Sequence, residues 1–220
     1  MIELTQLKGI VMGRLMPIKS VQDHDFQFTV KWFYNTNLAT FRNRIYPVWK
    51  DLPISYVEIG VYEGMSLVWM MQHVLTHPDS HAIGIDPWLM CIKYDEEYMD
   101  AVRHRAYHNL SPWKDRCSLI RGNSVEVIGR GLYREEKDLK RGSTDICFVD
   151  GDHHELATTL DGELCLKLVR PGGWILFDQI HTSKKKPGFA QDGLELFLER
   201  NGKQVKKIWE DGRMEAYEKL

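Results

Sequence analysis

Residues 144–155 run Thr-Asp-Ile-Cys-Phe-Val-Asp-Gly-Asp-His-His-Glu, an unbroken apolar stretch that ends in a dense cluster of polar side chains. Four consecutive apolar residues, 146–149, are typical of a strand that is buried on both faces. Such strands belong to parallel sheets, whose two faces are covered by helices. The stretch therefore predicts an α/β sheet with polar side chains at the carboxyl end of one strand.

The same alternation of short apolar runs and helical patterns continues on both sides of this stretch. The other predicted parallel strands are residues 55–60, 81–86, 117–121 and 174–178. The predicted helices are residues 65–75, 96–110, 124–129 and 189–200, and a helix that carries Leu156, Leu160, Leu164 and Leu168 on one face. Asp211-Gly212 predicts a hairpin between strands 204–210 and 213–218, which adds one antiparallel strand. We expect a doubly wound, mostly parallel, seven-stranded Rossmann-like sheet.

The first 52 residues differ from the rest because they are rich in aromatic side chains. They predict an N-terminal helical extension that packs on the sheet or over its ligand-binding edge. Pro53 marks the boundary with the main domain, residues 53–220.

Composition limits the possible classes of protein. The chain has 220 residues, 43% hydrophobic and 27% charged, which suits one globular domain. Its net charge of −2 argues against a protein whose main partner is nucleic acid or an anionic membrane. Apolar runs are too short to span a bilayer, no secretory signal is recognisable, and the four cysteines (Cys91, Cys117, Cys147 and Cys165) form no CxxC pair. We expect a cytoplasmic protein.

The loop after the first predicted strand, residues 60–66, reads GVYEGMS. A dinucleotide-binding loop has glycine at positions 62 and 65, where this chain has Tyr and Met, so the close approach of a pyrophosphate is disfavoured. A tight turn with Gly60, Gly64 and the Ser66 hydroxyl suits the amino-acid part of S-adenosylmethionine, whose ammonium Glu58 would balance. An ordinary strand-to-helix turn is the alternative.

The next two loops carry candidate contacts for a nucleoside. Asp86 ends the second predicted strand, where an acid accepts hydrogen bonds from ribose hydroxyls, and Trp88 would stack on adenine. Asn123 and Ser124 follow the third strand and would bond the adenine edge. Each of these residues also has a structural alternative. Asp86 could form a turn before Pro87, Trp88 could pack in the core, and Asn123 or Ser124 could cap the following helix.

Acidic residues follow the fourth and fifth predicted strands. If these strands are neighbours, Asp150, Asp152 and Asp178 converge, because parallel strands lie about 4.8 Å apart. Crowded carboxylates repel one another unless a cation lies between them, and oxygen ligands favour Mg²⁺, Ca²⁺ or Mn²⁺ over zinc. We expect a divalent cation, with Mg²⁺ as the first choice. The alternative is that Asp152 caps the next helix and Asp178 faces solvent.

Such a cation would orient a substrate hydroxyl and lower its pKa. Asp152, His153 or His154 would then take the proton, and the oxygen would attack the sulfonium methyl group in line. The alternative for the two histidines is an exposed position at the start of a helix.

Taken in order, these motifs resemble those of class I S-adenosylmethionine-dependent methyltransferases. The nearest likeness is to metal-dependent O-methyltransferases, both the catechol type and the group that acts on antibiotic sugars and macrolides. The motifs are ExGxYxGxS at 58–66, the acid at 86, GNS at 122–124, VDGDHHE at 149–155, LVRPGGWILFDQ at 168–179 and PGFAQDGLELFLE at 187–199.

The resemblance implies a role for each matching residue. Gly60, Tyr62, Ser66, Asp86, Asn123 and Ser124 would contact the cofactor. Asp150, Asp178 and Gln179 would hold the metal, and Asp152 would be the base, as in the sugar-modifying members. The family usually has Asp or Asn where this chain has Gln179, which keeps an oxygen ligand but is longer and uncharged.

The candidate cofactor contacts are Glu58, Gly60, Tyr62, Gly64, Ser66, Asp86, Trp88, Asn123, Ser124 and Asp150. The candidate metal ligands are Asp150, Asp178 and Gln179, and the candidate catalytic residues are Asp152, His153 and His154. The predicted reaction is cation-assisted transfer of a methyl group from S-adenosylmethionine to a hydroxyl of a small molecule: a sugar, a phenol or a natural product. The sequence leaves the oligomeric state open, and the resemblance implies a homodimer as the candidate assembly. The alternatives are a non-catalytic protein that binds S-adenosylmethionine or a nucleotide, and a metal-independent methyltransferase with a histidine base.

Overall fold

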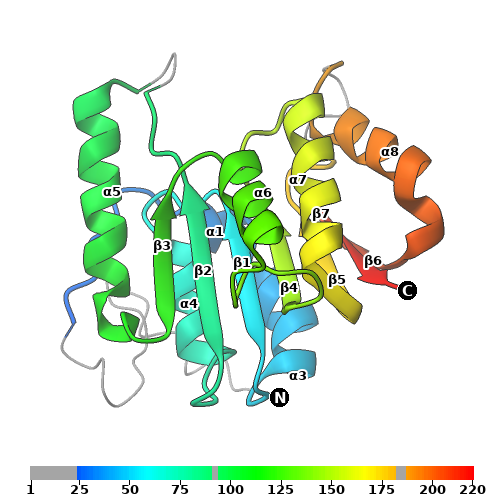
Figure 1. Cartoon of the computed structure of the whole chain (residues 1–220). Coiled ribbons are helices and arrows are strands. Elements are labelled where there is room, and N and C mark those ends of the chain that lie inside the picture. Colours follow the sequence, from blue (N-terminus) through cyan, green and yellow to red (C-terminus); the bar gives the residue numbers. More distant parts are fainter. Residues whose placement is uncertain (1–23, 91–93, 182–186) are drawn as a thin grey trace.

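The computed structural model describes residues 24–90, 94–181 and 187–220. Within these ranges, seven strands form one sheet in the order β3-β2-β1-β4-β5-β7-β6 (Figure 1). β7 runs antiparallel to both of its neighbours, β5 and β6, and the other pairs of neighbouring strands are parallel. The strands are β1 (Ser55–Ile59), β2 (His81–Asp86), β3 (Cys117–Arg121), β4 (Thr144–Val149), β5 (Val169–Phe177), β6 (Val205–Asp211) and β7 (Met214–Lys219). The predicted mostly parallel, seven-stranded sheet is confirmed.

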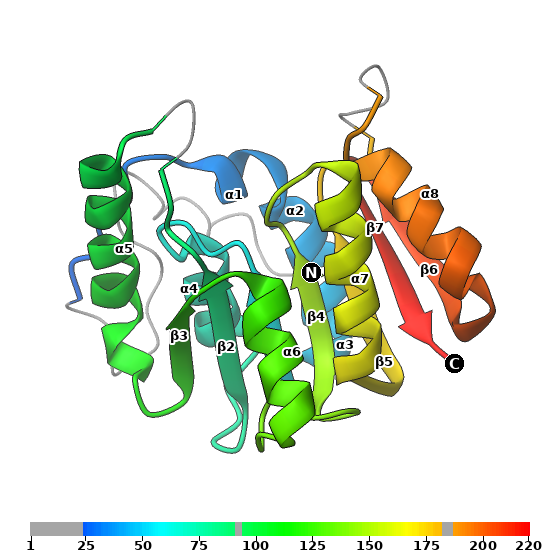
Figure 2. The ribbon, with the colours of Figure 1, turned by 45° about the horizontal axis from the view of Figure 1, so that its top comes forward.

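Helices cover both faces of the sheet (Figures 1 and 2). The first face carries α1 (Trp32–Thr36), α2 (Leu38–Thr40), a π-helical turn (Phe41–Ile45), α3 (Tyr46–Trp49), α4 (Met65–His73) and α5 (Glu96–Leu110). The second face carries α6 (Ser124–Arg134), α7 (Glu155–Leu168) and α8 (Ala190–Asn201). Short 3₁₀ turns span Ser111–Trp113 and Gly202–Gln204.

Side chains alternate between two cores along each central strand, because successive residues of a strand point to opposite faces. In β4, Phe148 packs in the core under α4, whereas Cys147 and Val149 pack in the core under α6 and α7. All three are buried. This arrangement explains why the strand is apolar at consecutive positions.

Two boundaries differ by several residues from the sequence-based expectation. The helix predicted to end at Gly129 continues to Arg134 as α6. A glycine is needed inside it, because a Cβ at Gly131 would lie 2.5 Å from the Cβ of Leu139 in the following loop. Strand β5 begins at Val169, ahead of the Pro171-Gly172-Gly173 sequence that was expected to precede it.

The described part of the N-terminal extension packs on the first face of the sheet. Phe41 contacts Phe148 with 5.2 Å between ring centroids, and Trp49 contacts Trp174 at 5.3 Å. Helix α1 then lies near the carboxyl ends of the strands (Figure 2). Residues 1–23 of the predicted extension lie outside the described residues, as does Cys91. Among the described helices, none has the length and apolar character that crossing a bilayer requires.

Candidate active site

A cavity of about 870 Å³ lies at the carboxyl ends of the central strands. The loops after β1, β2, β3, β4 and β5 line it, together with α1 and the first turns of α7. This is the position at which doubly wound sheets bind their ligands, and the volume suits a nucleoside-sized molecule.

The turn after β1 is fixed by close packing against β4. Gly60 has φ 88°, and a Cβ there would lie 2.1 Å from the carbonyl oxygen of Asp150. Glycine is therefore required by the approach of two backbones. Gly64 also has a positive φ, 78°, and precedes α4, but it does not line the cavity. The predicted contact of Gly64 with a ligand is not supported, whereas Gly60, Tyr62 and Ser66 all line the cavity.

Asp86 ends β2 as predicted and holds the turn after β1 in place. Its Oδ2 accepts hydrogen bonds from the backbone N–H groups of Val61 and Tyr62, both at 2.9 Å, and its Oδ1 accepts one from Trp88 at 2.7 Å. Burial raises the pKa of this carboxyl, and the three hydrogen bonds counter that effect. Asp86 lines the cavity, so contact with a ribose stays a prediction beside this structural role.

Glu58 does not reach the cavity, which corrects the prediction that it balances a ligand ammonium. The side chain points to the first face of the sheet and is fully buried. It accepts hydrogen bonds from Tyr56 Oη at 2.7 Å and Ser66 Oγ at 2.6 Å. Burial raises the pKa of Glu58 to about 7, although these hydrogen bonds oppose the rise. Glu58 therefore orients Ser66, and only Ser66 faces the cavity.

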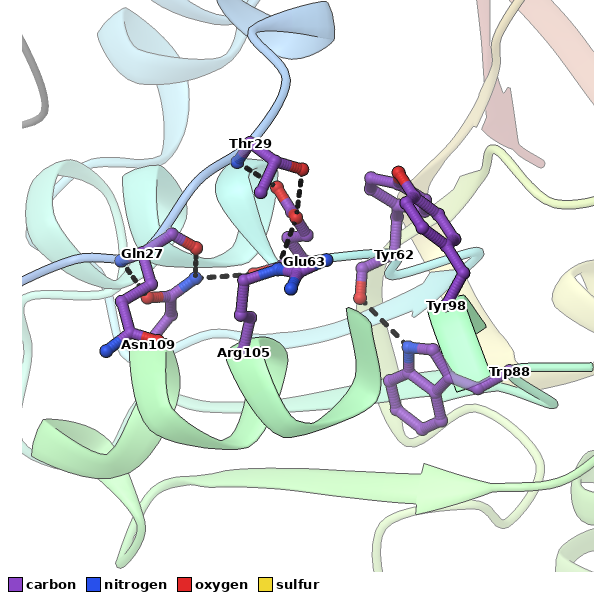
Figure 3. Close-up of polar contacts among 8 residues, drawn as sticks. All are labelled: Gln27, Thr29, Tyr62, Glu63, Trp88, Tyr98, Arg105 and Asn109. Atoms are coloured by element: carbon purple, nitrogen blue, oxygen red, sulfur yellow. Dashed lines mark hydrogen bonds and ion pairs between the residues drawn. The ribbon is translucent and has the colours of Figure 1, made fainter. Parts of the chain in front are cut away.

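Trp88 is a core residue, which corrects the prediction that it stacks on adenine. Its indole is 2% exposed and does not line the cavity. Its Nε1 donates to the carbonyl oxygen of Tyr62 at 2.9 Å (Figure 3). The indole therefore stabilises the turn after β1 through this hydrogen bond.

The N-terminal segment is tied to the same turn through buried polar groups (Figure 3). Glu63, 1% exposed, accepts hydrogen bonds from the backbone N–H of Thr29 at 2.8 Å and its hydroxyl at 2.6 Å, and pairs with Arg105 Nε at 2.6 Å. Asn109 pairs with both backbone groups of Gln27. These contacts lead directly into α1, whose Trp32 ring lies 4.7 Å from the ring of Tyr62 at the cavity.

Asn123 and Ser124 line the cavity at the start of α6. Asn123 caps this helix, with its Oδ1 accepting from the N–H of Val125 at 2.9 Å. Ser124 Oγ donates to Asp161 Oδ1 at 2.6 Å. Asn123 therefore caps α6, as the alternative interpretation of the sequence stated. Ser124 is paired with Asp161 on α7, which was not among the predicted site residues.

Asp150 and Asp178 converge at one end of the cavity, because β4 and β5 are neighbours. Ligand atoms of Asp150, His153 and Asp178 lie within 4.8 Å of one another. The guanidinium of Arg213, from the turn between β6 and β7, forms two hydrogen bonds with Asp178, at 3.0 and 2.8 Å. Burial and the nearby charge of Asp178 hold the pKa of Asp150 well above its usual range.

His153 is the histidine that joins the acidic pair. Its Nε2 lies 3.6 Å from Asp150 Oδ1 and within hydrogen-bonding reach of the side-chain amide of Gln179. Burial lowers the pKa of His153, so the ring is neutral near pH 7. Gln179 lies in the cavity wall with φ 58°. Its predicted role as a metal ligand stays a prediction.

Asp152 and His154 form a separate, exposed pair at the rim. Asp152 Oδ1 accepts from His154 Nδ1 at 2.5 Å, and the two side chains are 65% and 69% exposed. Partial burial tends to raise the pKa of Asp152, but the hydrogen bonds from His154 outweigh it and the pKa is lowered. Asp152 and His154 are paired with each other at the rim, whereas His153 lies beside Asp150 and Asp178, so the geometry favours His153 among the three predicted catalytic residues.

Among the other residues that line the cavity, the sequence did not predict three with polar side chains that matter here: Asn37, Asp161 and Arg213. Asn37 is 3% exposed, and its Oδ1 has no hydrogen-bond partner among the described residues. Each of the three stands outside the strand-end loops in the sequence. No local pattern marks them, because only the folded chain brings their elements to the cavity.

The sheet order, the single reversed strand and the position of the cavity define a ligand-binding protein of the doubly wound, Rossmann-like class. A family model described as a methyltransferase domain matches residues 57–180, more than half of the chain. The chain belongs to this methyltransferase family. The resemblance to methyltransferases drawn from the sequence is confirmed.

One curated protein is also similar to this chain in sequence. An uncharacterized protein of Acanthamoeba polyphaga mimivirus is 34% identical over 138 residues, which are 61% of this chain and 55% of that protein. The chain thus spans about half the length of this curated relative.

Solved structures show the same fold. An O-methyltransferase from Bacillus cereus, in complex with S-adenosylhomocysteine, has a TM-score of 0.53 at 20% identity. The match covers 75% of this chain and 74% of the Bacillus cereus chain.

MycE, a methyltransferase of the mycinamycin pathway in complex with Mg and S-adenosylhomocysteine, has a TM-score of 0.58 at 18% identity. The match covers 88% of this chain and 51% of the MycE chain.

Proposed function

We propose that this protein transfers the methyl group of S-adenosylmethionine to a hydroxyl group of a small molecule. The observation that carries the proposal is the cluster of Asp150, His153 and Asp178 at one end of the cavity. It combines an acidic pair, which can hold a cation or a polarised hydroxyl, with a neutral histidine that can accept a proton.

The cavity suits a nucleoside with an amino-acid arm and no phosphate chain. Tyr62 and Met65 replace the glycines that a pyrophosphate would need. The buried Asn37 Oδ1 lacks a partner among the described residues and offers an acceptor to the ammonium of the amino-acid part. The likeness to proteins solved with S-adenosylhomocysteine supports this ligand.

The donor set and its charge fit a divalent cation. Arg213 neutralises one of the two carboxylates. Burial and the nearby charge of Asp178 raise the pKa of Asp150, and a divalent cation held between the two acids would oppose that rise. Asp150 and Asp178, with the amide oxygen of Gln179, would hold the ion. When bound, it would polarise the acceptor hydroxyl and lower its pKa. The charges of the two acids and the deprotonated acceptor then balance those of the ion and the guanidinium.

His153 takes the proton of the acceptor hydroxyl in this proposal. Its Nε2 lies 3.6 Å from Asp150 Oδ1, and that carboxylate would stabilise the imidazolium that forms. The freed oxygen attacks the methyl carbon, the carbon–sulfur bond breaks, and the electron pair remains on sulfur as S-adenosylhomocysteine.

Arg213 supports a second candidate function, a metal-independent methyltransferase with His153 as base. Its guanidinium already binds both oxygens of Asp178 and supplies a positive charge at the site. In this case Arg213 stabilises the acceptor oxygen without an ion.

A binding titration and a turnover assay test the proposal. We expect S-adenosylhomocysteine to bind the wild-type protein. We also expect labelled S-adenosylmethionine to give methylated products with members of a panel of catechols, phenols and hydroxylated sugars. Asp150→Ala should abolish turnover, and EDTA should stop it until Mg²⁺ is restored.

The other outcomes of these assays separate the alternatives. Turnover that is insensitive to EDTA favours the metal-independent candidate. Tight cofactor binding without product across the panel favours a non-catalytic binding protein. A protein that binds neither S-adenosylmethionine nor its demethylated product refutes the proposal.

A further inference from the structure

A second cluster of metal-ligating side chains lies where the chain leaves β5 and meets the β6–β7 hairpin, at the edge of the sheet (Figure 2). It consists of His181, Glu210 and Glu215, and each offers one ligand atom within 4.8 Å of the others. None of the three lines the cavity, and the proposed chemistry does not use them. The cluster therefore needs an explanation of its own.

The two acids of this cluster face each other across the hairpin. Glu210 of β6 is paired directly with Glu215 of β7 in the register of the two strands. Like charges at directly opposite positions destabilise a pair of strands, and Glu215 is also buried. Such a pair is unfavourable unless positive charge lies beside it.

Lys207 supplies one positive charge, but it contacts only one oxygen of each acid. Its Nζ donates to Oε2 of Glu210 at 2.7 Å and lies 2.9 Å from Oε2 of Glu215. The Oε1 atoms lie beside His181 instead, whose Nε2 is 3.0 Å from that of Glu210 and 3.2 Å from that of Glu215. With a neutral imidazole, two carboxylates and one ammonium leave one negative charge uncompensated.

The three atoms that meet here are spaced like the ligands of an ion. Neither ring nitrogen of His181 has a hydrogen-bond partner among the described residues, although both nitrogens are buried. One N–H cannot point at two oxygens at once, whereas an ion between the three atoms contacts all of them. Nitrogen and oxygen atoms bound to one Zn²⁺ lie roughly 3–3.5 Å apart, and the observed separations of 3.0 and 3.2 Å fall in this range.

We propose that His181, Glu210 and Glu215 bind a divalent transition-metal ion, with Zn²⁺ as the first choice. An imidazole nitrogen together with two carboxylates favours zinc over Mg²⁺ or Ca²⁺, which prefer oxygen ligands alone. Three protein ligands leave the fourth position of a tetrahedral site to water. Lys207 and Tyr217 hold the second oxygen of the carboxylates by hydrogen bonds, as partners of metal ligands commonly do.

The ion would link the end of β5 to the hairpin that carries Arg213. The backbone N–H of Ile180 already donates to the carbonyl oxygen of Arg213 at 2.8 Å. A metal ion bound by His181 and the two acids adds a side-chain link between the same two segments. This role is structural, and it does not depend on the proposed methyl transfer.

A calorimetric titration with Zn²⁺ in the Asp150→Ala background tests the site, because this substitution removes an acid from the cluster in the cavity. The protein should bind one Zn²⁺ per chain. Adding Glu215→Gln or His181→Gln should weaken binding by at least about 100-fold, since loss of a mere partner of a ligand already costs roughly 10- to 100-fold. Glutamine at position 215 keeps an oxygen for Lys207 and Tyr217.

Asp211→Asn is the matched control, because it removes an acid next to Glu210 whose partner is Arg44, at 3.3 Å, outside the cluster. It should bind Zn²⁺ as tightly as the Asp150→Ala parent. Zn²⁺ should also raise the Tm of the parent and of this control, but not that of the Glu215→Gln variant. In the wild-type background, which needs no change in the cavity, Glu215→Gln should lower the number of bound Zn²⁺ ions by one.

Two results would overturn the proposal. The first is an Asp150→Ala protein that folds and binds no Zn²⁺, and the second is an affinity for Zn²⁺ that survives both Glu215→Gln and His181→Gln. In either case the cluster is an ion pair between His181 and the two acids. Neither result bears on methyl transfer, because His181, Glu210 and Glu215 lie outside the cavity.

Discussion

Replacing Arg213 with Leu is expected to lower the free energy of unfolding by about 3–5 kcal/mol, the usual cost of leaving a buried charge without its partner. The Asp178 side chain is 2% exposed, and the Arg213 guanidinium binds both of its oxygens. Asp150 adds a second acid beside it. Leu keeps much of the apolar volume of the arginine stem, so the loss reports mainly on charge. Urea denaturation of the metal-free protein at pH 7.5 measures it.

Arg44→Leu is the control for the loss of an arginine ion pair at the same end of the β6–β7 hairpin. Its partner is Asp211, at 3.3 Å, but these side chains are 47% and 34% exposed. Exposed pairs contribute little, so this variant should lose less than about 1 kcal/mol. Equal losses of unfolding free energy in the two variants would show that burial gives the pair of Arg213 and Asp178 no more stability than an exposed ion pair has.

The second large effect is expected from His153→Gln. Loss of a general base typically costs roughly 10²- to 10⁴-fold in rate, so kcat should fall within that range. Binding of S-adenosylhomocysteine should change only a few-fold, because His153 acts on the acceptor. Single-turnover methylation of an acceptor found in the panel measures the chemical step, and calorimetry measures the binding.

The neighbouring histidine provides a matched control for this experiment. His154 carries the same functional group one residue away, but it is 69% exposed and paired with Asp152 at the rim. His154→Gln should retain most of the wild-type rate. A larger loss of rate in His154→Gln than in His153→Gln would show that His154, and not His153, is the base.

The fold could be predicted from the sequence because its determinants are local. Continuous apolar strands such as residues 146–149 indicate burial on both faces, and the alternation with helices indicates a parallel sheet. The Asp211-Gly212 turn identified the reversed strand, and Gly212 does adopt a positive φ of 61°. The end of α6 was missed because Gly131 is required by a contact with Leu139, and no local rule reveals that contact.

The sequence predicted the positions of those site residues that directly follow a strand. Placing β4 beside β5 was enough to bring Asp150 and Asp178 together. Glu58 was misplaced because it stands on the first face of β1, where it bonds Ser66 and not a ligand. Arg213 and Asp161 were missed for a related reason, since a distant hairpin and the second turn of a helix carry them to the cavity.

A crystal structure of the protein with S-adenosylhomocysteine and Mg²⁺ would locate the cofactor and the ion in the cavity. We expect the sulfur atom beside Asp150 and His153, the amino-acid arm along the turn after β1, and the purine against Leu160 and Asp161. A nucleoside bound outside this cavity, or one whose purine lies against Asp178 with its sulfur remote from His153, would contradict this expectation.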